Sequence, residues 1–127
     1  MEITKSYKNE NKCVVLKLGL HFSQLENEVD GEVELDIENQ GKLVDVLTVV
    51  FSEDISVILV DLSLVSYIDS SGLWALFEGH KKAAQKECYF CLINPAIDVK
   101  RVLDITKVSS KMKIFETYDQ ALSNLDK

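Results

Sequence analysis

Residues 57–74 read VILVDLSLVSYIDSSGLW, and this stretch decides the fold. Its first four residues form a continuous apolar run rich in β-branched side chains, which is typical of a strand covered on both faces. A helical period then resumes at Leu73, Leu76, Phe77 and Ala84. The pattern therefore predicts a central strand and, after the Asp-Ser-Ser-Gly turn at residues 69–72, a helix that begins near Ser70 and Ser71.

The residues before this stretch combine strand and helix patterns. One face of an alternating segment carries Val14, Leu16, Leu18, Leu20 and Phe22. A turn signal, Asp30-Gly31, precedes a second alternating segment at residues 32–35, so we expect the two segments to form an opening hairpin. An amphipathic helix with Gly41 near its start is predicted from the spacing of Leu43, Val46, Leu47, Val50 and Phe51.

The residues after the central stretch continue the alternation of strand and helix. A second apolar strand at residues 89–93 ends at Asn94-Pro95, which predicts a helix capped by Asn94 with Pro95 in its first position. That helix has the apolar face Ala96, Val99, Val102 and Leu103. A short strand at residues 114–115 and a capping box of Thr117 with Gln120 complete the chain.

The predicted order is β-β-α-β-α-β-α-β-α, which places the chain in the α/β class. Strands separated by helices imply right-handed crossovers, so we expect a small mixed sheet with an antiparallel opening hairpin, otherwise mostly parallel strands and about four helices. A chain of 127 residues suits one domain over residues 1–127. Loops at the carboxyl ends of strands commonly carry binding sites in such folds, and residues 69–72 form one of these loops.

Charge and apolar content exclude several functions. Fourteen basic against twenty-one acidic residues give a net charge of −7, and the basic pairs at residues 81–82 and 100–101 are short, so we expect no nucleic-acid binding. The first residues carry no apolar signal core, and no apolar run approaches the ~20 residues of a membrane span. We therefore expect a cytoplasmic protein without membrane insertion.

The side chains that could support catalysis or hold a metal are sparse. Cys88 and Cys91 have the spacing of a zinc or redox half-site, but strand residues three apart point to opposite faces and no second ligand pair follows. We interpret them as small apolar residues of the core. The five glycines are scattered and form no phosphate-binding loop. Ser70 lacks the glycine-flanked elbow of a serine hydrolase, so we expect no catalytic residue, metal or bound cofactor.

The same residues resemble a known family, the STAS domain, named for sulphate transporters and anti-sigma factor antagonists. The similarity covers residues 57–74, continues through Asn94-Pro95 and residues 102–106, and extends to residues 114–115 and 121–122. It spans about two-thirds of the chain. The resemblance implies a small mixed sheet flanked by helices, the class that the hydrophobic periodicity also predicts.

The resemblance also implies a function. Bacterial single-domain members are anti-sigma factor antagonists that are switched by phosphorylation of the first serine after the aspartate, which is Ser70 here. Unphosphorylated, such a protein binds an anti-sigma factor that is also a serine kinase; phosphorylated, it releases this partner, and a serine phosphatase resets it. The kinase would supply ATP and Mg²⁺. The oligomeric state expected is a monomer or weak dimer.

The residues around Ser70 form the candidate docking surface. The match implies that Asp69 lies beside the acceptor hydroxyl and orients it, and that Gly72, followed by Leu73, allows a partner's backbone to approach closely. Helix capping is the alternative role for Asp69, Ser70 and Ser71, and for Ser71 it is the preferred one. Trp74 replaces the small residue that is common in the family. It is either an exposed interface anchor or packed against the hairpin.

Three further points remain open from the sequence. Asp36 resembles the family's acidic residue near the phosphoacceptor loop, yet a helix-capping role explains it equally well. The segment at residues 23–30 lengthens the opening hairpin beyond the family pattern. An alternative function is a STAS scaffold, or a subunit of a signalling or membrane transport complex, that carries no phosphate on Ser70; a hydrolase using Ser70 is a third possibility.

Overall fold

The computed structural model describes residues 1–125. Its strands are β1 (Glu2–Lys8), β2 (Cys13–Gly19), β3 (His21–Ser23), β4 (Glu28–Asp30), β5 (Val33–Leu35), β6 (Val57–Asp61), β7 (Val65–Ile68), β8 (Tyr89–Ile93) and β9 (Lys113–Phe115). The α-helices are α1 (Gln40–Phe51), α2 (Ser70–Gln85), α3 (Ile97–Ile105) and α4 (Tyr118–Leu125), and a 3₁₀ turn, η1, covers Val108–Ser110.

A five-stranded mixed sheet in the order β1-β2-β6-β8-β9 forms the centre of the molecule. β1 is antiparallel to β2, whereas β2, β6, β8 and β9 are parallel to their neighbours. Two small two-stranded sheets, β3-β4 and β5-β7, lie beside it. The predicted α/β class, the mixed sheet, the four helices and the central position of the 57–60 strand are all confirmed.

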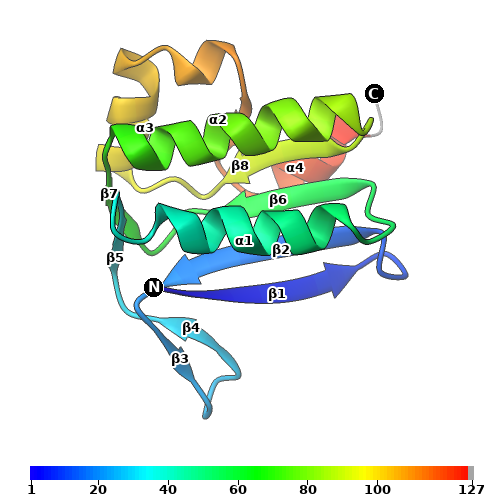
Figure 1. Ribbon diagram of the computed structural model, residues 1–127, viewed down its shortest axis with the longest axis horizontal. Coiled ribbons are helices and arrows are strands. Elements are labelled where there is room, and N and C mark those ends of the chain that lie inside the picture. The colour runs from blue at the N-terminus through cyan, green and yellow to red at the C-terminus, as the bar shows by residue number, and fades with distance from the viewer. Residues whose placement is uncertain (126–127) are drawn as a thin grey trace.

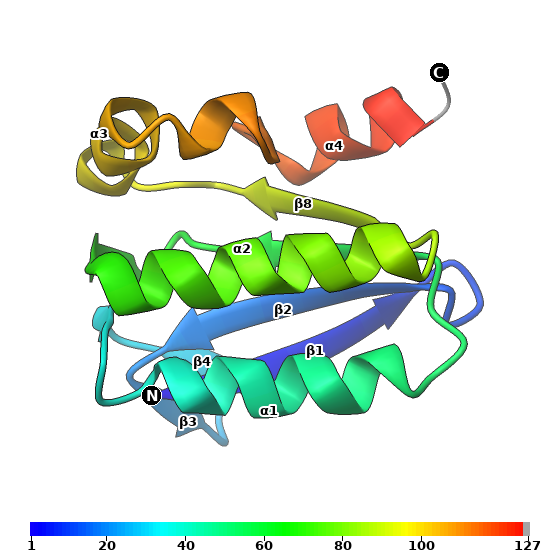
Figure 2. The same ribbon diagram turned by 45° about the horizontal axis from the view of Figure 1, so that its top comes forward.

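Alternation along β6 places side chains on both faces of the sheet. Ile58 and Val60 belong to the cluster beneath α1 and α2, while Leu59 belongs to a smaller cluster that includes Ala121 of α4. Figures 1 and 2 show α1 and α2 side by side over the sheet, with α4 on the other side of it. The central strand therefore contributes to both hydrophobic clusters.

The helices α1 and α2 approach each other closely because Gly79 has no side chain. A Cβ atom at Gly79 would lie 2.9 Å from Cδ1 of Leu47, which is buried on α1. The predicted apolar stripe of α1 is confirmed, since Leu43, Leu47 and Val50 are buried on one face. Gly41 lies in the first turn, as the sequence predicts.

The opening hairpin differs from the predicted one. β2 ends at Gly19, and Leu20 and Phe22 are exposed rather than buried, with relative exposures of 54% and 46%. The chain turns out of the sheet because the backbone N–H of Leu20 bonds the carbonyl oxygens of Asp30 and Gly31. The second predicted hairpin strand, residues 32–35, pairs in parallel with β7 as β5. The antiparallel hairpin of the main sheet consists of β1 and β2 instead.

Two predicted helix starts have different outcomes. The helix after β8 begins at Ile97 with Ala96 as N-cap, so its predicted start at Asn94 and Pro95 is wrong. Asn94 adopts a left-handed conformation, with φ 54°, and its N–H donates to the Phe115 carbonyl of β9. The capping box of α4 is confirmed in part. The Gln120 N–H donates to Oγ1 of Thr117 at 3.1 Å, but Oε1 of Gln120 accepts from the N–H of Glu116 rather than that of Thr117.

The cysteines lie within or beside strands. Cys13 and Cys91 are buried, Cys88 is half-buried, and all three are free thiols. Burial raises the pKa of Cys91 to about 12 and that of Cys88 to about 11. Raised thiol pKa values oppose the thiolate form that metal binding and redox chemistry require, which agrees with a core role for these residues.

Candidate functional site

Asp69 fixes the loop at the carboxyl end of β7. It is the N-cap of α2, and its Oδ1 accepts a hydrogen bond of 2.9 Å from the N–H of Gly72. Its Oδ2 accepts a second bond, of 3.1 Å, from the N–H of Ile37 in the segment after β5. One carboxylate therefore joins the first turn of α2 to a segment 32 residues earlier in the chain. The predicted cap at Ser71 is wrong, because Asp69 makes the capping bond.

Ser70 is the first residue of α2 and is exposed, whereas Ser71 is half-buried. The backbone at Ser70 is held on both sides of the residue, since Asp69 bonds Gly72 and the Leu73 N–H donates to the Asp69 carbonyl at 3.0 Å. The position also meets the positive end of the helix dipole. Ser70 thus presents a hydroxyl to solvent on a rigid backbone.

Gly72 is buried against its own chain. A Cβ atom there would lie 2.5 Å from the Leu35 carbonyl oxygen and 3.0 Å from Cγ2 of Ile68. The predicted role of admitting a partner's backbone does not fit this geometry, because β5 already occupies the space. Leu73 is half-buried and packs against the main core cluster. These two residues position α2 from within.

Asp36 lies in the turn before α1 and is not the N-cap of that helix, which is Asn39, so the helix-capping alternative is wrong. Its Oδ1 accepts bonds from the backbone N–H groups of Glu38 at 3.0 Å and Asn39 at 3.3 Å, which organises the turn before α1. It also adjoins Ile37, whose N–H bonds Asp69. Asp36 therefore lies near the Ser70 loop while it caps a local turn.

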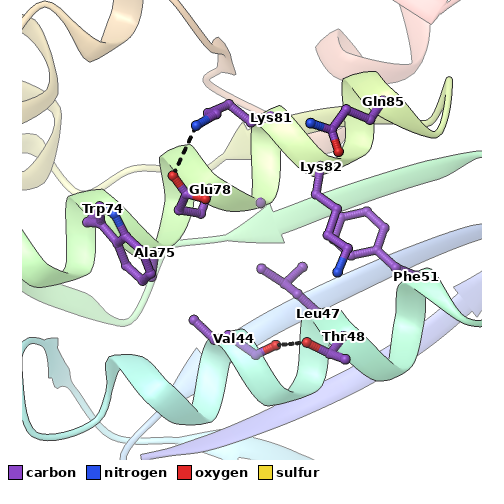
Figure 3. Close-up of a pocket in the computed structure, with 11 residues that line it drawn as sticks. Val44, Leu47, Thr48, Phe51, Trp74, Ala75, Glu78, Lys81, Lys82 and Gln85 are labelled. Atoms are coloured by element: carbon purple, nitrogen blue, oxygen red, sulfur yellow. Dashed lines mark hydrogen bonds and ion pairs between the residues drawn. The ribbon is translucent and has the colours of Figure 1, made fainter.

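Trp74 is exposed, with a relative exposure of 54%, and lines a groove between α1 and α2 (Figure 3). The alternative that it packs against the hairpin is therefore wrong. Ile37 and Tyr67 are also exposed large apolar residues, at 66% and 50%. We call Ile37, Tyr67 and Trp74 the apolar rim of Ser70, because each lies within four residues of Ser70 or is hydrogen-bonded to Asp69. Neither Tyr67 nor Ile37 could be assigned from the sequence. Burial in β7 does not alternate, since Ser66 and Tyr67 are both exposed, and Ile37 is brought to the site by a long-range bond.

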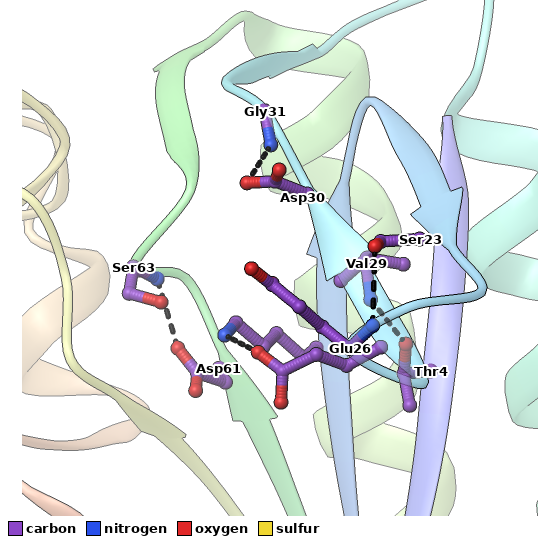
Figure 4. Close-up of polar contacts among 10 residues, drawn as sticks. Thr4, Ser23, Glu26, Val29, Asp30, Gly31, Asp61 and Ser63 are labelled. Carbon is purple, nitrogen blue, oxygen red and sulfur yellow. Dashed lines mark hydrogen bonds and ion pairs between the residues drawn. The ribbon is translucent and has the colours of Figure 1, made fainter.

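The segment at residues 23–30 lies away from Ser70. It forms most of the β3-β4 hairpin, which is fixed to the edge of the main sheet by a 2.9 Å bond from the Val29 N–H to Oγ1 of Thr4 (Figure 4). Lys17 of β2 pairs with Glu28 at 2.7 Å, and this hydrogen bond raises the pKa of Lys17. The added hairpin is thus docked beside β1 and β2 rather than at the candidate site.

Neither histidine is placed as a base for Ser70. His21 lies on the hairpin, with Nδ1 3.2 Å from the Asp30 carbonyl oxygen, and His80 lies beside the rings of Phe77 and Phe90. Within residues 1–125, no group of three or more His, Cys, Asp or Glu side chains could hold a metal ion. No helix in this part of the chain is long and apolar enough to cross a membrane.

Solved structures share the whole fold. An anti-sigma factor antagonist from Mycobacterium paratuberculosis is 20% identical, with 99% of this chain and 96% of that chain covered and a TM-score of 0.74. The anti-sigma factor antagonist SpoIIAA in its unphosphorylated form is 17% identical, with 98% and 96% covered and a TM-score of 0.71. Bacillus SpoIIAA in the phosphorylated form is 15% identical, with 98% and 99% covered and a TM-score of 0.65.

A different kind of protein also has this fold. A sulfate transporter family protein from Wolinella succinogenes is 17% identical, with 89% of this chain and 84% of that chain covered and a TM-score of 0.69. No curated protein sequence matches the chain. The model of the STAS domain matches residues 28–121, which include the Ser70 loop and most of the elements around it. The chain therefore belongs to the STAS domain family.

Proposed function

We propose that this protein is an anti-sigma factor antagonist that works as a phosphorylation switch. Unphosphorylated, it binds an anti-sigma factor that is also a serine kinase. Phosphorylated on Ser70, it releases that partner, and a serine phosphatase restores the binding form. The kinase supplies ATP and Mg²⁺, so the chain needs no cofactor and no catalytic residue of its own. Because the partner controls transcription, we place the protein in the cytoplasm.

The exposed position of Ser70 carries this proposal. Its hydroxyl is open to a kinase. Asp69, the residue before it, holds the loop in place by accepting bonds from the N–H groups of Gly72 and Ile37. Phosphorylation adds about −1.5 to −2 charges at pH 7 without removing any of those bonds. The switch can therefore act on the surface while the domain stays folded.

The surroundings of Ser70 explain why the added charge would repel a partner. The apolar rim of Ile37, Tyr67 and Trp74 is suited to a partner surface that excludes water. A phosphate in that interface has to be desolvated, and the carboxylates of Asp69 and Asp36 nearby add like charge. That SpoIIAA has been solved in both phosphorylated and unphosphorylated forms supports a switch on this fold.

The test combines phosphate mapping with binding. The purified protein is incubated with ATP, Mg²⁺ and candidate serine kinases from its own source, and the phosphate is located by mass spectrometry. We expect one phosphate on Ser70, none on Ser70→Ala, and undiminished phosphorylation of the control Ser71→Ala. The anti-sigma factor should still bind Ser70→Ala. It should bind Ser70→Asp about tenfold or more weakly, because the new carboxylate adds negative charge to an interface that already holds Asp69 and Asp36.

A second candidate is a scaffold or a subunit of a membrane transport complex. The sulfate transporter family protein with the same fold favours it. This function needs no phosphate. It therefore predicts that Ser70 stays unmodified while the kinase phosphorylates a control substrate, and that Ser70→Asp binds the partner as tightly as the parent protein does. A hydrolase is tested separately with a serine-reactive fluorophosphonate probe, which we expect to leave Ser70 unlabelled.

A further inference from the structure

The two helices α1 and α2 run in the same direction across one face of the sheet (Figure 2). Side chains from both helices line a groove between them (Figure 3). Trp74 and Val44 lie at its beginning, and Lys82 and Phe51 lie at its end. Gly79 contacts Leu47 beneath it, so the floor is closed. We call this feature the α1-α2 groove.

The shape of the α1-α2 groove suits a helix. Its lining on α2 extends over twelve residues, from Trp74 to Gln85, which is about 16 Å or about three helical turns. The groove is open along its length, whereas pockets for small molecules enclose most of their ligand. Amphipathic helices bind such apolar grooves through residues spaced i, i+3, i+4 and i+7.

The charge of the groove is concentrated at one end. Lys82 Nζ lies 5.9 Å from the ring centroid of Phe51, and within the described residues no ion pair joins Lys82 to a carboxylate. Lys81, by contrast, is paired with Glu78 at 3.3 Å. On a chain of net charge −7, Lys82 gives this end of an apolar groove a local positive charge.

The helix dipoles favour one direction for a helix bound in the α1-α2 groove. Both α1 and α2 end near Phe51 and Lys82, so the negative ends of two dipoles lie there. A helix whose N-terminus lies at that end presents its positive dipole end to them. Acidic residues are favoured in the first turn of a helix, where they would also meet Lys82.

We infer that the α1-α2 groove binds an amphipathic helix of a protein partner, antiparallel to α1 and α2, with acidic residues in its first turn against Lys82 and apolar residues against Trp74 and Phe51. This goes beyond the proposed function, because the contact does not require a phosphate on Ser70. It gives the protein a docking surface that adjoins the apolar rim of Ser70, with Trp74 common to both.

Trp74 is the only tryptophan of the chain, so its fluorescence reports occupation of the groove directly. The probe is a synthetic peptide of about 15 residues, near the length at which isolated helices become stable. It carries leucines at i, i+4, i+7 and i+11 and two glutamates in its first turn. The matched peptide carries these two glutamates in its last turn. We expect the first peptide to shift Trp74 emission saturably and the second to bind more weakly.

Protein variants separate the groove from the phosphoacceptor. Lys82→Glu should weaken the first peptide about fivefold, as expected for losing an exposed ion pair, and a peptide with lysines in place of the glutamates should restore binding. Lys111→Glu, exposed and outside the groove, makes the same change of net charge and should have no effect. Ser70→Asp should leave peptide binding unchanged even if it alters partner binding.

Three results of the peptide experiments would overturn the inference. These are an unchanged Trp74 emission with either peptide up to millimolar concentration, equal binding of the two peptides, and equal binding to the parent protein and Lys82→Glu. Self-association in sedimentation experiments that Lys82→Glu abolishes would also overturn it, because the occupant would then be a second copy of the chain.

Discussion

Gly72 shows how one residue sets the position of α2. Because a Cβ atom would lie 2.5 Å from the Leu35 carbonyl oxygen, a rigid backbone atom, α2 or β5 must shift to accept any side chain. We expect Gly72→Ala to lower the free energy of unfolding by about 1–3 kcal/mol, the usual cost of overpacking. Urea denaturation followed by circular dichroism measures this change.

Gly41 provides the matched control for Gly72. It also lies in the first turn of a helix, but nothing lies within 4 Å of a Cβ atom built on it. Gly41→Ala should therefore raise stability by up to about 1 kcal/mol, because alanine loses less backbone entropy than glycine in a helix. Equal effects of the two substitutions would contradict the close packing of Gly72 on β5.

Cys91 gives stability a dependence on alkaline pH. Burial raises its pKa to about 12 from the ordinary value of 9.0, so the folded protein keeps a proton that the unfolded chain loses. The stabilising contribution is fully present below pH 9 and is lost as the pH rises from there toward 12. We expect the free energy of unfolding to fall between pH 8 and 10.5, and to fall less in Cys91→Ala, when both are measured by urea denaturation.

At the scale of elements, Asp69 connects α2 to the segment between β5 and α1. Each carboxylate oxygen serves one of them, Oδ1 the Gly72 N–H and Oδ2 the Ile37 N–H. Asp69→Ala removes both acceptors and should lower the free energy of unfolding by about 2 kcal/mol, the upper range for an N-cap. Asp69→Asn keeps one acceptor oxygen and should cost less.

Amide hydrogen exchange identifies which bond each substitution breaks. We expect the Ile37 and Gly72 amides to lose protection in Asp69→Ala, and one of the two to keep it in Asp69→Asn. Ser71→Ala is the control, because Ser71 does not cap α2. A stability loss in Ser71→Ala as large as that in Asp69→Ala would contradict this assignment of the cap.

Elements whose burial follows one regular period were predictable from the sequence. The continuous apolar run of β6 and the stripe of α1 need no knowledge of a distant partner to be recognised. β1 was missed because its sequence, EITKSYK, is mostly polar, as edge strands often are. β5 was assigned the wrong partner because its true neighbour, β7, follows more than 25 residues later.

The candidate site, too, was predictable from the sequence only in part. The loop at residues 69–72 was located from the sequence, since strand, turn and helix follow one another there. The roles within it were not, because the carboxylate of Asp69 and the hydroxyl of Ser71 are both acceptable helix caps. The close contact of β5 with Gly72 shows that the fold itself needs this glycine. The hydrogen bond from the Ile37 N–H to Asp69 shows that Ile37 belongs to the site.

At the scale of the whole molecule, residues before the family match are part of the core. The STAS domain model begins at residue 28, yet β2 lies between β1 and β6, and Leu16 and Leu18 within it are fully buried. The same strand contributes Cys13 to the smaller cluster on the opposite face. The first strands therefore complete both hydrophobic clusters that β6 connects.

This connection predicts a single cooperative unfolding transition. Trp74 reports the layer of α1 and α2, while Cys91 lies in the cluster beneath α4, and β6 contributes side chains to both faces. We expect the urea midpoint from Trp74 fluorescence to equal the midpoint from thiol labelling of Cys91 in a variant without Cys13 and Cys88.

Leu59→Ala removes a fully buried side chain from the smaller cluster and should lower the free energy of unfolding by about 2–5 kcal/mol. If β6 couples the layers, this substitution moves both midpoints equally, although Trp74 lies on the other side of the sheet. A shift of the Cys91 midpoint alone would instead mean that the two faces unfold independently.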